Sequence, residues 1–176
     1  MRKIWMATSS KLESYQTKKP LATIRAENII KQPLKFNFPK KFNGKKPTPK
    51  QNNIKAAVVR EKGSNSEREM AYMMDLSGFV VRDVHMTDLI EGRENLEDID
   101  LLVAVGGFSN SDVLGSAKGW AGAFKYNPKA KSAIENFFQR PETLSLGVCN
   151  GCQLFIELGL ITPNHKKQPK MLHNDS

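Results

Sequence analysis

The chain is poor in the features that stabilise secreted proteins and in the apolar runs that anchor membrane proteins. Its 176 residues include two cysteines, Cys149 and Cys152, and three histidines. The N-terminus has no apolar run long enough for a secretory signal. Because stabilising disulfides belong mainly to secreted proteins, we do not expect the two thiols to form one. No stretch approaches the roughly 18 consecutive apolar residues of a membrane span. We therefore expect a cytoplasmic protein without a membrane partner.

Positive charge is confined to the first part of the chain. Residues 1–50 contain 13 Lys and Arg but 2 Asp and Glu, whereas the other 126 residues contain 14 basic and 16 acidic side chains. Residues 30–53 combine four prolines with repeated lysines and show no helical or strand period, which predicts a linker. Loose helical spacing in residues 1–30 predicts one or two short helices without a core. We divide the chain into a basic segment, 1–53, and a domain, 54–176.

A nucleic-acid-binding module is the alternative interpretation of the basic segment. Only Phe36, Phe38 and Phe42 offer rings that stack on bases, and no known binding fold is apparent around them. Charge runs of this kind are usually solvated linkers. We expect no nucleic-acid partner.

From residue 54 onward, short apolar runs alternate with helical patterns. Strands are predicted at 54–59, 79–84, 101–105 and 143–148, and helices at 66–76, 117–124 and 128–138. Strands and helices therefore alternate along the chain, except that the second and third strands follow each other without a predicted helix between them. This order indicates an α/β fold with a doubly wound parallel sheet. The first helix is expected to begin with a capping box of Ser66 and Glu69 and to bury Met70, Met73 and Met74.

Ligands of such sheets bind beyond the carboxyl ends of the strands, and two loops there are unusual: GGFSNSD at 106–112 and CNGCQ at 149–153. Cys149 lies between Gly147 and Gly151, where an apolar strand changes to a helical pattern. This is the layout of a nucleophile elbow, in which a strained turn exposes the side chain and flanking glycines avoid collisions. The helix N-terminus favours the thiolate, the nucleophilic form.

Other roles for the two cysteines remain open from the residues alone. Free cysteines are often small core residues, and we expect Cys152 to be one, buried against the sheet. The C-x-x-C spacing also occurs in redox and zinc sites, but no histidine pair supplies further zinc ligands and three strands precede the motif. We expect no metal.

Acyl transfer at a thiolate needs donors for the developing oxyanion. The backbone N–H of Asn150 offers one, and Gly106-Gly107, after a neighbouring strand, offers a second. The alternative for the glycine pair is a simple tight turn.

These residues resemble a known family. The strings VVREKGSNSEREMA, LLVAVGGFSNSDVLGSAKGWA, LSLGVCNGCQL and MLHNDS are similar to the glutaminase domain of the large, single-chain phosphoribosylformylglycinamidine synthases, which are class I glutamine amidotransferases of flavodoxin-like fold. The resemblance covers about residues 54–176. It implies that Cys149 is the nucleophile, that Gly107 and Asn150 form the oxyanion hole, and that Gln153 contacts glutamine.

The resemblance also implies a partner and a pathway. Ammonia from glutamine would pass to synthetase domains of the same enzyme, where ATP and Mg serve the amidination of formylglycinamide ribonucleotide in purine biosynthesis. No cofactor is expected in this chain. Fold alone does not separate this function from that of other cysteine hydrolases of flavodoxin-like architecture.

The sequence departs from the family at two points. Asn110-Ser111 stands where many relatives carry Tyr-Gly, which removes no reactive group. The family's general base, a histidine, follows the NDS motif, whereas this chain stops at Ser176. His85, His165 and His173 are interpreted as structural or solvated histidines. We therefore expect a domain incomplete at its C-terminus and almost inactive alone as a glutaminase.

Overall fold

The computed structural model describes residues 2–16, 21–31, 35, 37, 39–41, 43–45, 48 and 52–172. The chain divides into two compact units, Met1–Lys45 and Lys46–Leu172, and each is described by itself. Within the described ranges, no helix has the length and apolar character needed to cross a membrane. His173, in the MLHNDS string, lies outside the described residues.

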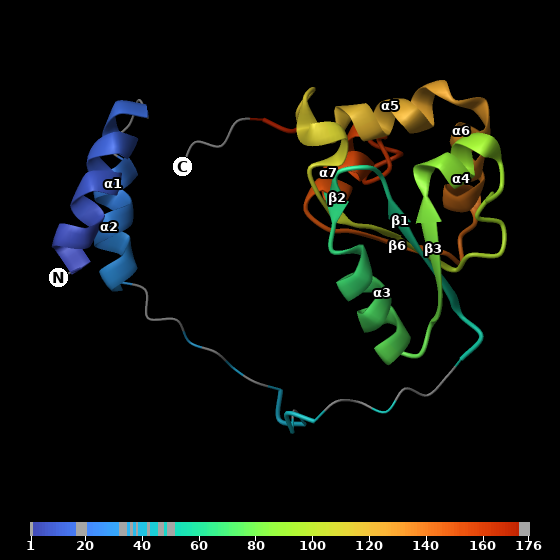
Figure 1. Ribbon diagram of the computed structural model, residues 1–176, viewed down its shortest axis with the longest axis horizontal. Helices are drawn as coiled ribbons and strands as arrows, with labels where there is room; N and C mark the ends of the chain where they lie inside the picture. Colours follow the sequence, from blue (N-terminus) through green and yellow to red (C-terminus); the bar gives the residue numbers. More distant parts are fainter. Residues whose placement is uncertain are drawn as a thin grey trace. The chain divides into compact units, whose positions relative to one another are not determined.

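The smaller unit contains two helices, α1 (Arg2–Gln16) and α2 (Leu21–Lys31), which pack side by side (Figure 1). An ion pair of 2.7 Å joins Arg25 on α2 to Glu13 on α1. Ala22 on α2 is buried. One or two short helices were predicted in this segment, and the structure has two in its described residues.

The larger unit is built on a four-stranded parallel sheet. Its strands are β1 (Lys55–Arg60), β3 (Val80–His85), β4 (Leu101–Ala104) and β6 (Leu144–Gly147), in the order β3-β1-β4-β6. This order is that of the first four strands of a flavodoxin-like sheet. The predicted α/β fold with a parallel sheet is confirmed, and each strand lies within one or two residues of its predicted bounds.

Five helices flank the sheet. They are α3 (Glu67–Leu76), α4 (Met86–Glu91), α5 (Lys118–Tyr126), α6 (Pro128–Gln139) and α7 (Asn150–Glu157). Helix α3 packs on β1 and β3, whereas α4 to α7 pack on one another as one layer. From β1 the chain crosses to β3 at one edge of the sheet, and from β3 it crosses in the opposite direction, past β1, to β4. Right-handed crossovers that run in opposite directions place their helices on opposite faces of the sheet. Helix α3 therefore covers one face and the layer α4 to α7 the other.

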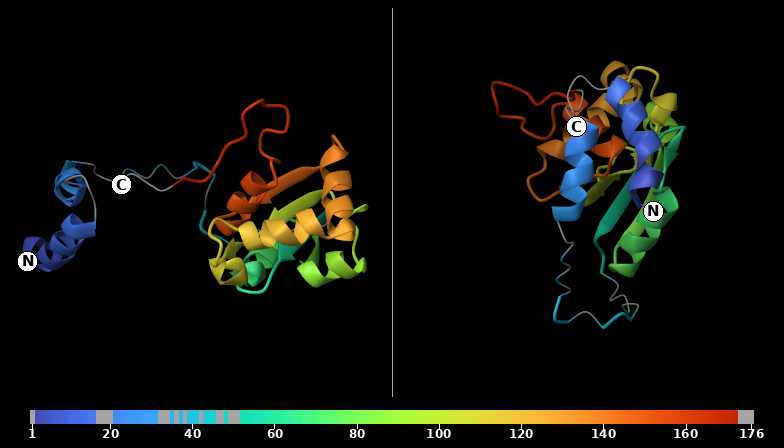
Figure 2. Two further views of the ribbon diagram at one scale, coloured as in Figure 1. Left: turned by 90° about the horizontal axis from the view of Figure 1, so that it is seen from above. Right: turned by 90° about the vertical axis from the view of Figure 1, so that its left-hand side faces the viewer.

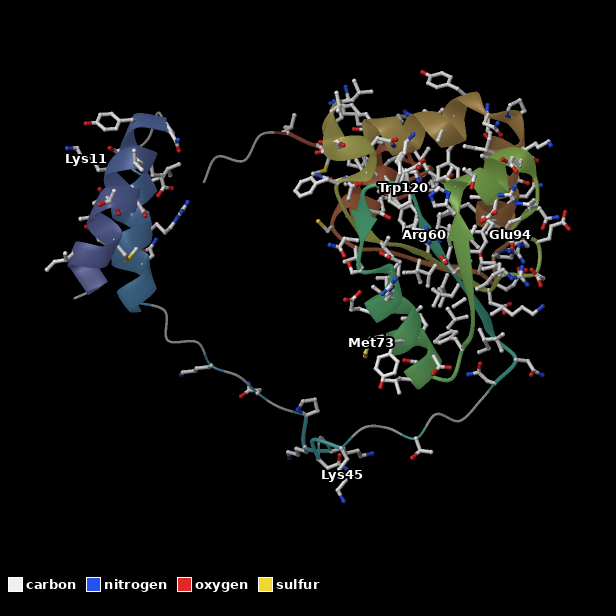
Figure 3. The ribbon with its side chains drawn as sticks, in the orientation of Figure 1. Lys11, Lys45, Arg60, Met73, Glu94 and Trp120 are labelled. Carbon is white, nitrogen blue, oxygen red and sulfur yellow. The ribbon has the colours of Figure 1, made fainter. Side chains whose placement is uncertain are left out.

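The core lies between the sheet and the layer of four helices. Strands β1 and β4 are buried almost throughout. Burial was expected for two apolar runs, 101–105 and 143–148; it is confirmed for β4 and wrong for β6, an edge strand that is largely exposed. Trp120, Phe124 and Phe137 are the largest buried side chains, and Trp120 is seen in the interior beneath α5 in Figure 3. Burying each of these rings contributes about 2–3 kcal/mol, so α5 and α6 are firmly fixed to the sheet.

The expected capping box at the start of α3 is wrong. Ser66 has a left-handed backbone (φ 69°) and makes no side-chain cap. Its hydroxyl donates instead to the carbonyl of Asn65 at 2.5 Å. The chain must turn sharply here because Ser64 and Asn65 are paired with another loop, and this pairing overrides the local capping preference.

Two further predictions about the helices need correction. A short helix, α4, separates β3 from β4, so the two middle strands are not consecutive elements; its six residues are too few to show a helical period. Met73 is 53% exposed rather than buried and projects from α3 into solvent in Figure 3. Met70 and Met74 do pack against the core.

Two loops at the carboxyl edge of the sheet are paired with each other. The two-residue strands β2 (Ser64–Asn65) and β5 (Gly106–Gly107) form an antiparallel ladder. It ties the loop after β1 to the loop after β4, next to the start of α7. After α7, residues 160–172 loop out from the body of this unit (Figure 2).

Candidate functional site

Cys149 occupies a strained turn between β6 and α7. Its φ of 53° and ψ of −111° lie outside the regions that L residues prefer. The chain reverses direction at this residue, and α7 begins directly after it, so the thiol stands at the carboxyl edge of the sheet and at a helix N-terminus. The thiol is exposed. This is the geometry of a nucleophile elbow.

The two flanking glycines are required by close backbone contacts, as the sequence predicted. A Cβ at Gly151 would lie 2.0 Å from the carbonyl oxygen of Ala104 on β4. A Cβ at Gly147 would lie 2.8 Å from the carbonyl oxygen of Gly151. Both contacts involve backbone, which cannot move aside like a flexible side chain, so any larger residue would displace α7 from the sheet.

The first N–H of α7 has no acceptor. Gly151 donates to the Val148 carbonyl at 2.9 Å, and Cys152 and Gln153 donate to the Cys149 carbonyl at 3.1 and 3.2 Å. In the part of the chain that the structure describes, the N–H of Asn150 makes no such bond. It is one of the orphan donors of a helix N-terminus, in the residue next to the thiol. That position suits the oxyanion donor predicted for Asn150.

Gly106 and Gly107 lie against the elbow. A Cβ at Gly106 would come within 3.2 Å of the Cβ of Cys149 and 3.8 Å of its Sγ. Gly107 has φ 94°, and a Cβ there would lie 2.5 Å from the backbone nitrogen of Asn65. Only glycine fits both the left-handed backbone and this close approach to β2.

The ladder also decides where the N–H of Gly107 points. Phe108 donates its N–H to the Gly63 carbonyl at 3.0 Å. Gly63 and Phe108 are therefore a hydrogen-bonded pair of the ladder. Hydrogen-bonded and non-hydrogen-bonded pairs alternate along an antiparallel ladder. The next pair, Ser64 and Gly107, is non-hydrogen-bonded, and its N–H groups point away from the partner strand. On that other side β5 contacts α7. We infer that the N–H of Gly107 faces the helix that follows Cys149.

A buried hydrogen-bond chain joins the two loops, and the sequence did not reveal it. Ser109 and Asn150 are each 1% exposed. The hydroxyl of Ser109 donates to Oδ1 of Asn150 at 2.6 Å, and Nδ2 of Asn150 donates to Oε1 of Gln153 at 3.0 Å. Nothing in the string GGFSNSD distinguishes Ser109 from Ser111, which is exposed; only the fold brings Ser109 next to Asn150.

The loop after Ser109 is strained. Asn110, Ser111 and Asp112 have φ of 52°, 55° and 49°, values that cost L residues about 1 kcal/mol each. Asn110 is held in place, since its N–H bonds to the Lys62 carbonyl at 2.9 Å and its Cβ packs on Gly119. Ser111 therefore stands where a glycine would carry no strain.

Cys152 is exposed, which contradicts the predicted burial against the sheet. Helix α7 turns Leu154 and Phe155 to the core, and the backbone of Cys152 lies close to Gly147 of β6. Among the described residues, no cluster of His, Cys, Asp or Glu has the arrangement of a metal site.

Two histidines, His85 and His165, lie within the described residues. His85 ends β3 and caps α4, where its Nδ1 accepts the N–H of Thr87 at 3.2 Å. Three strand spacings separate β3 from β6, which is about 14 Å. His165 is exposed in the segment after α7. Across the residues that the structure describes, no histidine makes a hydrogen bond to the thiol of Cys149.

A cluster of ion pairs lies at the opposite edge of the sheet. Arg82 donates two hydrogen bonds of 2.9 Å to Asp98, and Lys55 donates one of 2.6 Å. These bonds hold the pKa of Asp98 well below its usual range, and those from Arg82 have the largest effect. Lys55 begins β1 and Asp98 precedes β4, so the cluster ties the amino ends of the strands and is remote from the thiol.

Comparison with known proteins points to one family. A model of the CobB/CobQ-like glutamine amidotransferase domain matches residues 53–176. The fold is similar to a chain in the structure of PurLQS from Thermotoga maritima, with 27% identity and a TM-score of 0.50, over 62% of this chain and 46% of that chain. Both findings confirm the expected likeness to the amidotransferase domain of phosphoribosylformylglycinamidine synthases. The roles of individual site residues stay predictions.

Proposed function

Because the chain belongs to the CobB/CobQ-like glutamine amidotransferase domain family, we propose that Cys149 is the nucleophile that releases ammonia from glutamine. The thiolate attacks the carbon of the side-chain amide and forms a sulfur–carbon bond. The carbon–nitrogen bond then breaks, and the nitrogen takes a proton and leaves as ammonia. Water hydrolyses the resulting glutamyl thioester to glutamate.

The observation that carries this proposal is the surroundings of the thiol. Cys149 is exposed at the N-terminus of α7, in a backbone conformation that only a fixed turn maintains. The unbonded N–H of Asn150 is adjacent, and the N–H of Gly107 is directed to the same side. Two such donors stabilise the oxyanion of an acyl-transfer reaction. Gln153, one turn further along α7, is available to contact the substrate.

The likeness to PurLQS supports a more specific role. In this proposal the ammonia passes to synthetase domains of the same enzyme, in the cytoplasm. There ATP and Mg drive the amidination of formylglycinamide ribonucleotide in purine biosynthesis, and the complete protein is a glutamine-dependent carbon–nitrogen ligase. In this proposal the general base is a histidine supplied from outside residues 52–172, since His85 caps α4 beyond the far edge of the sheet and His165 makes no hydrogen bond to the thiol.

The test is mass spectrometry of the purified chain after treatment with a chloromethyl ketone analogue of glutamine. We expect labelling of Cys149 ahead of Cys152, and we expect glutamine, but not asparagine, to slow it. The control is Cys149→Ala, which keeps Cys152 and should lose the glutamine-sensitive label. Equal labelling of both thiols that is indifferent to glutamine would contradict the proposal.

A further inference from the structure

The loop of Gly107 and the helix of Cys149 come from different parts of the chain. Gly107 follows β4, whereas Cys149 and Asn150 follow β6. An oxyanion hole made of one N–H from each segment works only if the two are held in fixed register, because donors must lie within about 3 Å of the oxygen they stabilise. Something must therefore fix the loop to the helix.

On one side the loop is fixed to β2. Phe108 and Asn110 donate their N–H groups to the carbonyls of Gly63 and Lys62, at 3.0 and 2.9 Å. These bonds hold the loop to the segment after β1, but they do not set its distance from α7.

On the other side, one side-chain bond spans from the loop to α7. Ser109, between those two donors, gives its hydroxyl to Oδ1 of Asn150 at 2.6 Å. Both residues are 1% exposed, so water does not compete for the bond, and buried polar groups of this kind have strongly preferred positions. Asn150 is also the residue whose backbone N–H is the second predicted oxyanion donor.

We propose that Ser109 is a positioning residue for glutamine cleavage, which holds the Gly107 N–H in register with the Asn150 N–H through its bond to Asn150. This inference rests on the proposed function. The same chain of bonds orients Gln153. Its Oε1 accepts from Asn150 at 3.0 Å, so its amide NH2 remains to donate to an acceptor of the substrate, such as a carboxylate or carbonyl oxygen.

The experiment compares two electrophiles on the full chain. With the chloromethyl ketone analogue of glutamine, the thiolate first attacks the ketone carbon and gives an oxyanion. Sulfur then bonds to the adjacent carbon as chloride leaves, and the first sulfur–carbon bond breaks as the ketone forms again. Iodoacetamide reacts by displacement of iodide at a saturated carbon, without an oxyanion. The ratio of the two rates at Cys149 therefore measures the oxyanion hole separately from thiol reactivity and folding.

Ser109→Ala should lower this ratio about tenfold or more, while the iodoacetamide rate changes less than twofold. The matched control is Ser111→Ala, the same change on the same loop at an exposed side chain, which should leave the ratio unchanged. Asn150→Ala removes the bond from its other end but keeps the backbone N–H, so it should lower the ratio as well. The double variant should fall no further than the larger single effect, because both changes break one bond.

The outcomes separate the two proposals. An unchanged ratio in Ser109→Ala and Asn150→Ala, in a chain whose Cys149 is labelled in a glutamine-sensitive way, would overturn the role of Ser109 alone. Equal falls in both rates would also overturn it, because they indicate a general loss of structure. Absence of glutamine-sensitive labelling in the unaltered chain would instead contradict the proposed function. If Ser109→Ala does not fold, Asn150→Ala decides the question.

Discussion

Gly151 and Gly122 offer a sharp test of the elbow geometry. Both are helical glycines, and helix propensity alone predicts that replacing either with alanine stabilises the chain by about 1 kcal/mol. The structure predicts opposite signs. A Cβ at Gly122 would lie 3.7 Å from the ring of Tyr126, an ordinary contact, whereas a Cβ at Gly151 would lie 2.0 Å from the carbonyl oxygen of Ala104.

The expected magnitude follows from what has to move. Ordinary contact begins at 3.4 Å, so α7 and β4 must separate by about 1.4 Å in Gly151→Ala. The carbonyl that blocks the new Cβ also accepts the N–H of Val148 at 3.0 Å, and this bond holds β6 to β4 just before Cys149. Overpacking costs about 1–3 kcal/mol and the weakened bond about 1 kcal/mol. Allowing for the propensity gain of about 1 kcal/mol, we expect a net loss of about 1–3 kcal/mol.

The assay is urea unfolding of both variants, followed by circular dichroism at 222 nm. Gly151→Ala should unfold at a clearly lower urea concentration than the unaltered chain, and Gly122→Ala at the same or a higher one. Alkylation of Cys149 by the glutamine analogue should also slow in Gly151→Ala. If the two variants prove equally stable, the close approach of α7 to β4 is wrong, and the elbow with it.

Three further outcomes are expected. Ser111→Gly should raise the free energy of unfolding by about 0.5–1 kcal/mol, because glycine removes the strain at φ 55°; Ser111→Ala, which keeps the Cβ, should not, and an equal gain in both would contradict the strain. Asp98 has a lowered pKa in the folded chain, so its pairing with Arg82 stabilises above about pH 4 and fades as pH falls further. Since both side chains are over 40% exposed, Asp98→Asn should cost no more than about 1 kcal/mol at pH 7. A difference from the unaltered chain that does not shrink as pH falls from about 5 to 2 would refute the assignment. Cys152→Ser should leave alkylation of Cys149 unchanged within about twofold, since Cys152 is exposed; a larger fall in peptide-mapping assays would give the second thiol a role.

The sheet and the elbow were predictable because their signals are local. Buried parallel strands such as 101–104 are continuous apolar runs, and the glycines at 147 and 151 mark the points where backbones approach. Pro128, which begins α6, is likewise a local signal. Each of these features depends on a few adjacent residues, so one sequence suffices to find it.

The errors occur where distant segments meet. Ser66 lacks its cap because Asn65 pairs with Gly106, a contact between residues about 40 positions apart. Cys152 is exposed because Leu154 and Phe155 take the core face of α7, and the sequence of so short a helix fits more than one orientation. The same limit hid the bond between Ser109 and Asn150, since nothing in either loop signals the other.

The most direct test of the central claim is to ask which atom glutamine acylates. The chain is incubated with isotopically labelled glutamine, quenched in acid and mapped by peptide mass spectrometry. Because no histidine among residues 52–172 makes a hydrogen bond to Cys149, hydrolysis of the thioester should be slow. We therefore expect a glutamyl group on the peptide of Cys149, at the thiol of that residue and not at Cys152. A glutamyl group on Cys152, or none on either thiol while Cys149 still reacts with iodoacetamide, would contradict it.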